Sequence, residues 1–411
     1  MTDCGKYLVL SEQYLPLKGG HIVLLHELGR RLGQVHVLTG RLDGSPDGEA
    51  IEGVDVLRVD LRHRWWLRPE SLQIYAGLYR HGGRLIRQNR ATVLVAARVL
   101  PEGYVANLLG RRFGLPTVVF AHGEEISPHL PTAPRHKRRR VTAAMKRRSL
   151  WRTYHRADLI IANSRFTRGL LLEGGVAAEK VAVVHPGTDP ERYRPLPRDE
   201  ALARRLGLDG RRVLLTVGRL TRRKGQEVVL RALPAIRQAV PNVVYAMTSD
   251  GPLRPQLKDL ARTLGLDEAV RFLGEVPFDM LPALYNLSDV FVMPSRVWPQ
   301  TQDLEGFGIV FLEANACGLP VVGGRSGGIP DAVAEGETGL LVDGTQSDEV
   351  AAACVRLLRD RDLARAMGAK GRERVLREFT WDHAAARVRA LVEAAVRRDT
   401  AALERMCAEC L

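Results

Sequence analysis

Two glutamates, Glu305 and Glu313, flank a glycine-rich stretch with the sequence EGFGIVFLE. Gly306 and Gly308 carry no side chain, so the backbone N–H groups of this stretch can approach a ligand closely. The apolar run after the glycines predicts a helix, whose N-terminus would attract an anion. Paired carboxylates alone are common on protein surfaces. The stretch therefore indicates a ligand-binding loop only in combination with other residues.

A second candidate group lies in GRLTRRKGQ, which follows the apolar run RVLLTVG. This segment places Arg219 and Lys224 on one loop that leads into a helix. Fixed cations at a strand-to-helix turn are what a diphosphate leaving group requires. The alternative interpretation is a solvated basic turn, since Arg222 and Arg223 lie in the same segment.

Short apolar runs alternate with helical patterns along the chain. Runs closed by polar residues or glycine are typical of buried parallel strands, and the first set is YLVL, QVHVLTG, VDVLRVD, ATVLVAARV, PTVVFAHG and ADLIIANS. A second set is RVLLTVGR, NVVYAMTS, AVRFLGEV, DVFVMPS, PVVGG and GLLVDG. This alternation predicts an α/β protein with two Rossmann-like, doubly wound domains facing a cleft, and with ligands at the carboxyl ends of the strands.

Proline positions predict the domain boundaries. Four prolines between residues 186 and 197 indicate a linker. We predict an N-terminal Rossmann-like domain over 1–188, a second over 189–378, and a C-terminal helix and tail over 379–411. The last of these contains FTWDHAAARVRALVEAAVRR, whose periodicity is that of an amphipathic helix. We expect this helix to cross back and pack on the N-terminal domain.

Composition narrows the functional class. The 411 residues are 45% hydrophobic and 26% charged, which suits large cores and excludes a disordered, collagen-like or disulfide-scaffold protein. The net charge of +14 favours contact with phosphates or an anionic surface. No run approaches the roughly 20 apolar residues of a transmembrane helix, and the first residues lack a signal-peptide pattern. We therefore expect a cytoplasmic protein, peripheral at the inner membrane face if it binds membrane.

In combination, the motifs resemble those of the retaining glycosyltransferases of family 4, which have the GT-B fold of two Rossmann-like domains. The resemblance covers most of the chain. Within the family, the sequence looks most like the bacterial mannosyltransferases that build phosphatidylinositol mannosides. The motifs that carry the resemblance occur in order: Gly19-Gly20, AHGEE (121–125), ANSRF (162–166), HPGTD (185–189), GRLTRRKG, EGFGIVFLEANACGLPVV, GGIPD and FTW.

The resemblance implies donor-binding roles in the C-terminal, nucleotide-sugar-binding domain. Glu305 would hydrogen-bond the donor sugar, and Glu313 would bind the ribose hydroxyls. Arg219 and Lys224 would clamp the diphosphate. The backbone between the glutamates would contact the sugar hydroxyls and the distal phosphate through Gly306, Phe307, Gly308 and Ile309.

The resemblance also implies roles in the N-terminal, acceptor-side domain. Gly19 and Gly20 would let the first loop approach the same phosphates, and His122 would lie beside the reacting sugar. Arg219, Lys224, His122 and Glu305 are thus the expected catalytic residues. Two positions depart from the family pattern: Ser249 replaces the first glycine of a Val-Gly-x-Gly-Pro turn, and Asp331 replaces glutamate in GGIPD.

The implied reaction moves a hexose from a nucleoside diphosphate sugar to a lipid-linked or glycan hydroxyl, with retention at the anomeric carbon. The favoured donor is GDP-mannose; UDP-glucose and UDP-N-acetylglucosamine are alternatives. The diphosphate oxygen would accept the acceptor's proton on the face from which it leaves. No metal or other cofactor is expected, because the cationic clamp would stabilise the leaving group.

Two other patterns are expected to be incidental. Asp360-Arg361-Asp362 is a literal Asp-x-Asp, but it lies at a predicted helix–helix junction, and a metal site needs convergent ligands. Cys407 and Cys410 form a C-x-x-C near the end of the chain without the second pair that a zinc site usually needs.

A basic strip over residues 135–156 contains no acidic residue. It is interpreted as a patch for an anionic membrane surface, where each Lys or Arg contributes about 1 kcal/mol. An exposed basic helix without a partner and a nucleic-acid contact are alternatives, but no recognised nucleic-acid module is visible, so nucleic acid is not the predicted partner. Trp65 and Trp66, between arginines, add weight to the membrane interpretation.

Two different functional classes stay open at this point. One is a sugar-nucleotide 2-epimerase on the same fold, which resembles the GRLTRRKG and EGFGIVFLE motifs less well. The other is a non-catalytic basic protein that binds membranes. A dehydrogenase is not predicted, because no G-x-G-x-x-G follows the first strand.

Overall fold

The computed structural model describes residues 5–17, 19–61, 70–130 and 140–408. The chain forms two compact units. The first consists of Met1–His185 together with Trp381–Leu411, and the second of Pro186–Thr380. The first unit is therefore built from both ends of the chain.

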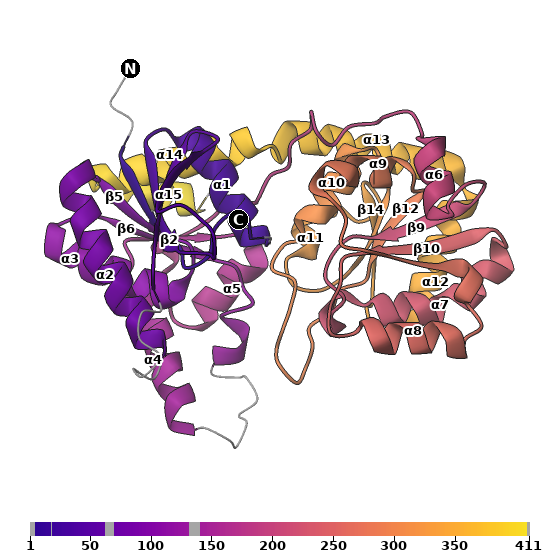
Figure 1. Ribbon diagram of the computed structural model, residues 1–411, viewed down its shortest axis with the longest axis horizontal. Helices are drawn as coiled ribbons and strands as arrows, with labels where there is room; N and C mark the ends of the chain where they lie inside the picture. The colour runs from indigo at the N-terminus through magenta and orange to yellow at the C-terminus, as the bar shows by residue number, and fades with distance from the viewer. Residues whose placement is uncertain (1–4, 18, 62–69, 131–139, 409–411) are drawn as a thin grey trace. The chain divides into compact units, whose positions relative to one another are not determined.

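The sheet of the first unit has eight strands in the order β3-β4-β2-β1-β5-β6-β7-β8 (Figure 1). All neighbours pair in parallel except β3 and β4, which are antiparallel. The order reverses between β1 and β5, so the loops after these two strands diverge there. The strands are β1 (Tyr7–Leu10), β2 (Val35–Gly40), β3 (Gly48–Ile51), β4 (Val54–Val59), β5 (Val93–Ala96), β6 (Thr117–Ala121), β7 (Leu159–Ala162) and β8 (Val181–Val183).

The central strands of this sheet are buried on both faces because helices cover them. Every residue of β1, β5, β6 and β7 is buried, as expected for parallel strands between helical layers. Short helical turns lie at η1 (Val99–Gly103), η2 (Ser127–His129) and η3 (Ala178–Lys180). The helices of this unit are α1 (Gly20–Leu32), α2 (Glu70–Asn89), α3 (Tyr104–Phe113), α4 (Arg140–Arg156), α5 (Arg165–Glu173), α14 (Trp381–Arg397) and α15 (Thr400–Ala408).

The C-terminal helices complete the first unit, as the sequence predicted. Helix α14 packs on α1 and buries one apolar face, which includes Leu391 and Val392. At the edge of this contact, Arg31 Nε lies 2.8 Å from Asp382 Oδ1. Arg389 also donates a hydrogen bond to the backbone oxygen of Arg31. The contact joins residues more than 350 positions apart in the chain.

The second unit has a six-stranded, fully parallel sheet with the order β11-β10-β9-β12-β13-β14. The order reverses between β9 and β12, and this reversal is the topological switch point of a doubly wound sheet. The strands are β9 (Arg212–Thr216), β10 (Val243–Thr248), β11 (Val270–Gly274), β12 (Val290–Met293), β13 (Val321–Gly324) and β14 (Gly339–Val342).

Two apolar cores lie on the opposite faces of this sheet. One face packs against α7, α8 and α12, and the other against α6, α9, α10 and α13 (Figure 1). Short turns lie at η4 (Arg222–Lys224), η5 (Asp267–Ala269) and η6 (Phe278–Met280). The helices are α6 (Glu200–Leu206), α7 (Gln226–Ala239), α8 (Arg254–Thr263), α9 (Leu281–Asn286), α10 (Ile309–Ala316), α11 (Ile329–Ala332), α12 (Ser347–Arg359) and α13 (Arg361–Glu378).

The predicted α/β class with two Rossmann-like sheets is confirmed. Two strands were not predicted. β3 is a short antiparallel edge strand with exposed residues. β8 (Val181–Val183) directly precedes the proline-rich segment 186–197 that the sequence indicated as a linker. Trp65 and Trp66 lie outside the described residues.

Candidate active site

The two sequence motifs with candidate chemistry meet at the switch point of the second sheet. η4 follows β9, and the loop that leads into α10 follows β12. Because β9 and β12 are neighbours in a parallel sheet, their carboxyl ends lie at the same edge. Ligands of open α/β sheets bind at this position. The sheet order thus brings Lys224 and Glu305 together from distant parts of the chain.

Glycine permits the close approach of these two loops. Gly225 has φ 77°, in the left-handed region, and a Cβ atom at this position would lie 2.4 Å from the backbone oxygen of Pro294. Any side chain would therefore push the η4 turn away from the loop after β12. The hydrogen bond from Arg296 N–H to the backbone oxygen of Arg223, at 2.9 Å, fixes the same contact.

Two cations from η4 converge on one carboxylate. Lys224 Nζ and Arg223 Nη1 each lie 2.5 Å from Glu305 Oε2. Arg223 Nε also lies 3.2 Å from Asp303 Oδ1. The side chains of Lys224 and Glu305 are only 10% and 13% exposed, so solvent screens this pair weakly. The sequence did not single out Arg223, whose basic turn allowed a solvated interpretation.

The ion pairs keep Glu305 ionised. Burial alone would raise the pKa of Glu305, but the charges and hydrogen bonds of Lys224 and Arg223 outweigh burial and lower its pKa from 4.5 to about 2. The neighbouring carboxylate behaves differently: burial raises the pKa of Asp303, and Arg223 offsets this only in part.

Glu313 lies in a different environment, although it belongs to the same loop and helix. Its carboxylate is buried on α10 and accepts a hydrogen bond from the Tyr285 hydroxyl at 2.7 Å. Burial raises the pKa of Glu313, and the tyrosine hydroxyl lowers it by a smaller amount. The ring of Tyr193 packs edge-on against Tyr285, with centroids 5.9 Å apart. Tyr285 was not identified from the sequence, because it lies on a separate helix, α9.

The backbone between the glutamates is held in an open turn. Gly308 has φ 95° and precedes α10, while the Phe307 side chain is buried. Gly328 N–H donates to the backbone oxygen of Glu305 at 3.0 Å. A Cβ atom on Gly327 would lie 2.3 Å from the same oxygen. The glycines of GGIPD therefore position the Glu305 backbone, which leads on through Gly306 to Ile309 at the first turn of α10.

Arg219 is not part of the ion-pair cluster. Its side chain is exposed, and its backbone oxygen accepts a hydrogen bond from Gln226 Nε2 at 3.1 Å. The structure therefore brings Lys224, but not the Arg219 side chain, to Glu305.

The departure at Ser249 keeps the geometry that glycine normally provides. Ser249 has φ 70°, a conformation that is costly for a residue with a Cβ atom. Its hydroxyl donates to Glu275 Oε1 at 2.8 Å, and the Asp250 N–H donates to the same oxygen at 3.2 Å. These bonds stabilise the turn. The second departure, Asp331, is buried in α11.

Asp360, of the Asp-x-Asp pattern, has a structural role. Asp360 accepts a hydrogen bond from Leu363 N–H at 2.9 Å and caps the N-terminus of α13. Asp362 is almost fully exposed. No cluster of three or more His, Cys, Asp or Glu side chains suited to a metal occurs in the described part of the chain. Cys407 is buried in α15, and Cys410 lies outside the described residues.

In the first unit, the predicted residues lie at the carboxyl edge of the sheet. Gly19 and Gly20 precede and begin α1, after β1. His122 directly follows β6. His122 Nε2 lies 2.8 Å from the backbone oxygen of Ala97, and because a carbonyl only accepts, Nε2 donates the hydrogen of this bond.

A second histidine faces His122. The rings of His21 and His122 have centroids 5.9 Å apart. Burial lowers the pKa of His21 to about 3, and the nearby His122 and Arg98 contribute to this shift. His21 is therefore neutral at physiological pH. The Glu125 carboxylate orients the loop by accepting hydrogen bonds from the His122 N–H and the Tyr154 hydroxyl, both at 2.9 Å.

Comparison with known proteins assigns the family. The chain matches the description "Glycosyltransferase Family 4" over residues 22–192 and "Glycosyl transferases group 1" over residues 198–374. It belongs to glycosyltransferase family 4, has the GT-B fold, and is a hexosyltransferase that uses a nucleotide sugar.

Three similar proteins illustrate this relationship. One is a GDP-mannose-dependent alpha-(1-6)-phosphatidylinositol monomannoside mannosyltransferase of Mycolicibacterium smegmatis, 37% identical over 76% of this chain and 85% of that protein. Another is a D-inositol 3-phosphate glycosyltransferase of Salinispora tropica, 33% identical over 89% of this chain and 78% of that protein. The third, sucrose-phosphate synthase from Thermosynechococcus elongatus, shares the fold: TM-score 0.79, 24% identity, 97% of this chain and 100% of that chain.

The ion pairs of Glu305 predict a pH-dependent effect on stability. We expect Glu305→Gln to lower the free energy of unfolding by about 3 kcal/mol at pH 7, because two weakly screened cations lose their partner. Because the pKa of Glu305 is lowered in the folded protein, its ionised carboxylate stabilises the fold fully above pH 4.5. This contribution is lost as the pH falls towards 2. The difference between wild type and variant, measured by chemical denaturation, should therefore narrow from pH 7 to pH 3.5.

Glu373→Gln is the matched control for this measurement. Glu373 forms an exposed ion pair with Arg377 at 3.5 Å, which contributes little. A Glu305→Gln variant as stable as this control, or a difference that widens in acid, would contradict the assigned ion pairs.

Proposed function

We propose that this protein transfers mannose from GDP-mannose to a hydroxyl of a lipid-linked acceptor of the phosphatidylinositol mannoside type, with retention at the anomeric carbon. The observation that carries the proposal is the meeting of Lys224 and Glu305 at the switch point of the second sheet. The names of the mannosyltransferases that this chain resembles support the donor and the acceptor.

The proposed chemistry relies on fixed charge. Lys224 would stabilise the negative charge that develops on the departing diphosphate, together with Arg219 and the backbone N–H groups at the start of α10. An ammonium group has three donor hydrogens, so the bond from Lys224 to Glu305 does not exclude bonds to phosphate oxygens. The cations of η4 would thus supply the leaving-group stabilisation for which other enzymes use a metal.

The two glutamates would act as binding groups and not as acid and nucleophile. Glu305, kept ionised by its cations, accepts hydrogen bonds and would orient the hydroxyls of the donor sugar. Glu313, fixed by Tyr285, would bind the ribose hydroxyls. The acceptor proton would pass to a diphosphate oxygen on the reacting face. Gly19, Gly20 and His122 of the first unit are proposed contributors to the same reaction.

Ligand-induced stabilisation tests the proposed donor. A ligand that binds only the folded protein raises the melting temperature, so GDP-mannose should raise it without added metal, and more than UDP-glucose, UDP-N-acetylglucosamine or ADP-sugars do. In Glu313→Gln, the shift produced by GDP-mannose should fall as affinity drops about tenfold. Without ligand, the free energy of unfolding of Glu313→Gln should not be lower than that of the wild type. The raised pKa of Glu313 means that its ionised form opposes folding at neutral pH.

The exposed carboxylate of Glu268 provides a control, since Glu268→Gln should keep the full shift. No shift with any nucleotide sugar would remove the proposed donor, and a full shift in Glu313→Gln would remove the proposed ribose contact.

Turnover tests the role of Lys224. Lys224→Ala should lower kcat by roughly 10²–10³-fold, the usual effect of removing one group that stabilises developing charge. Radioactive transfer from GDP-mannose to phosphatidylinositol mannoside measures the rate, and D-inositol 3-phosphate serves as the comparison acceptor. Arg222→Ala is the control, because Arg222 shares the turn but is exposed and stacks on Trp298 at 5.1 Å. Equal rates in the two variants would exclude the proposed role.

A lipid-linked acceptor also predicts membrane contact through the basic strip over residues 135–156. Of this strip, residues 140–156 form α4, and Arg138 and Arg139 lie outside the described residues. None of the described helices is both long and apolar enough to cross a bilayer. Arg138→Gln, Arg139→Gln and Arg140→Gln together should weaken binding to anionic vesicles by tenfold or more, but leave the donor-induced shift unchanged.

Arg80, Arg84 and Arg405 provide the matched control, since they are exposed arginines of the same unit. Their triple glutamine variant removes the same charge and should keep vesicle binding. Equal vesicle binding by both triple variants in a sedimentation assay would leave the strip as a solvated basic helix.

A further inference from the structure

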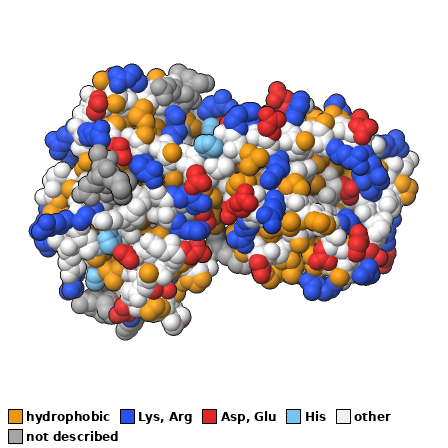
Figure 2. All heavy atoms as spheres, turned by 90° about the horizontal axis from the view of Figure 1, so that it is seen from above, with side chains coloured by type: hydrophobic (Ala, Val, Ile, Leu, Met, Phe, Trp, Pro, Cys, Tyr) orange, Lys and Arg blue, Asp and Glu red, His pale blue; other side chains and the backbone are white. Residues whose placement is uncertain are grey.

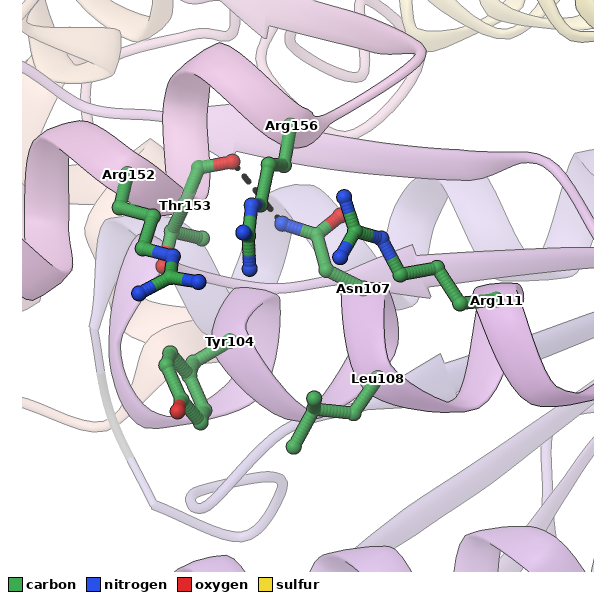
Figure 3. A pocket seen from close by; sticks show the side chains of 7 residues that line it. All are labelled: Tyr104, Asn107, Leu108, Arg111, Arg152, Thr153 and Arg156. Atoms are coloured by element: carbon green, nitrogen blue, oxygen red, sulfur yellow. Dashed lines mark hydrogen bonds between the residues drawn. The ribbon is translucent and has the colours of Figure 1, made fainter.

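Three arginines gather on the first unit, away from the proposed active site. Arg111 lies on α3, and Arg152 and Arg156 lie on α4. In Figure 3, the Arg156 side chain lies between those of Arg152 and Arg111, above Tyr104 and Leu108. These five residues line one small cavity together with Asn107 and Thr153, so no carboxylate is among its lining residues.

These three cations lie apart from the carboxylates of the described residues. Some other arginines lie beside carboxylates, as Arg223, Arg31 and Arg296 do, and on the face shown in Figure 2 basic and acidic side chains are interspersed. By contrast, neither Arg111, Arg152 nor Arg156 has a carboxylate within ion-pair distance among the described residues. Desolvation, together with the charges of Arg111 and Arg152, lowers the pKa of Arg156. Three converging cations repel one another unless an anion binds them.

The place of the cluster separates it from the proposed reaction. Asn107, Arg111 and Arg156 also line an open groove of about 780 Å³, a volume within the range of ligand sites. The groove runs past Pro116 and Asp158, which precede β6 and β7, to Lys180 before β8. It therefore lies at the amino edge of the sheet, whereas His122 lies at the carboxyl end of β6. The five residues of β6 separate the two edges by about 16 Å.

The shape and the charge suggest which kind of ligand would fit. The cavity between the arginines, about 10 Å³, holds roughly one water molecule, so an anion would bind at its exposed rim. Guanidinium groups match the oxygens of a phosphate with paired hydrogen bonds. The adjoining groove is lined by apolar residues such as Leu115, Ala395 and Leu403 and also by the acidic residues Asp158, Glu179 and Glu404. An organic group attached to the phosphate could lie along the apolar part.

We infer that Arg111, Arg152 and Arg156 form a binding site for the phosphate group of a phosphate ester, with the ester's organic part in the groove beside α15. The site lies apart from the proposed donor site, although Arg152 and Arg156 also belong to the basic strip over residues 135–156. The phosphate could belong to a phospholipid headgroup or to a small soluble ester. Exposed apolar side chains of the same two helices, Leu108 (40% exposed) and Met145 (65% exposed), are compatible with a lipid source.

Binding measurements on full-length variants test this site. The Lys224→Ala variant serves as the parent protein for all samples. This change removes Lys224, which is proposed to bind the donor diphosphate and could otherwise bind the phosphate probes. In this background, Arg111→Gln, Arg152→Gln and Arg156→Gln are combined, and the Arg80, Arg84 and Arg405 triple glutamine variant is the control. Two probes are used. Binding of glycerol 3-phosphate is measured by calorimetry at constant ionic strength. The second probe is phosphatidylcholine vesicles with or without one-fifth phosphatidylglycerol.

The expected result is saturable binding by the parent and the control, and at least tenfold weaker binding by the Arg111/Arg152/Arg156 variant. Loss for glycerol 3-phosphate identifies a soluble ester, and loss for the phosphatidylglycerol vesicles alone identifies a lipid headgroup. Equal binding by both triple variants, or no binding of either probe by the parent, overturns the inference.

Two further measurements keep this result interpretable. The melting temperature of each variant shows whether it folds, and the double variant Arg111→Gln with Arg152→Gln, which changes only exposed side chains, replaces the triple variant if that variant is unstable. The same three arginine changes in the wild-type background should leave the donor-induced shift intact. Failure of the proposed donor and failure of the phosphate site are thus observed separately.

Discussion

The ion pair between Lys224 and Glu305 links the fold of the second unit to its chemistry. The two residues come from loops on either side of the strand-order reversal, so they meet only if β9 and β12 are neighbours. Gly225 allows the necessary approach of the two loops. Arg223, Lys224, Asp303 and Glu305 carry equal numbers of formal positive and negative charges. The proposed attraction for a diphosphate would therefore also depend on groups outside this balance, namely the exposed Arg219 and the helix N-termini at the same edge.

Glu305 and Glu313 have the same carboxylate group, but their surroundings shift its pKa in opposite directions. Glu305 meets two cations, which lower its pKa, whereas Glu313 meets a tyrosine hydroxyl in a buried position, where desolvation raises its pKa. One carboxylate is held as an anion by its neighbours, and the other is held in place mainly by packing and a single hydrogen bond. Both arrangements fix the direction of the carboxylate oxygens, as the proposed contacts with sugar and ribose hydroxyls require.

The sequence predicted the α/β class from the periodicity of its apolar runs, and the return of the C-terminal helix from the resemblance to proteins with the GT-B fold. It also indicated Lys224 and Glu305, since their types and glycine-rich surroundings are recognisable locally. Arg223 and Tyr285 could not be found in this way. The carboxylates that they contact are distant in the sequence, so the local pattern around each residue does not reveal the contact. For the same reason, the sequence did not separate Arg152 and Arg156 from the rest of the basic strip. Their relation to Arg111 depends on how α3 packs beside α4.

The first unit takes its last two helices from the end of the chain, and this has a consequence for how the protein is made. During synthesis, the contiguous second unit emerges complete while the first still lacks the segment that covers α1. Until α14 arrives, the apolar face of α1 that lies beside Val388 and Val392 is exposed to solvent and to other chains. The half of the molecule that leaves the ribosome first is thus the last to finish folding, and its early need for protection from aggregation follows from the topology alone.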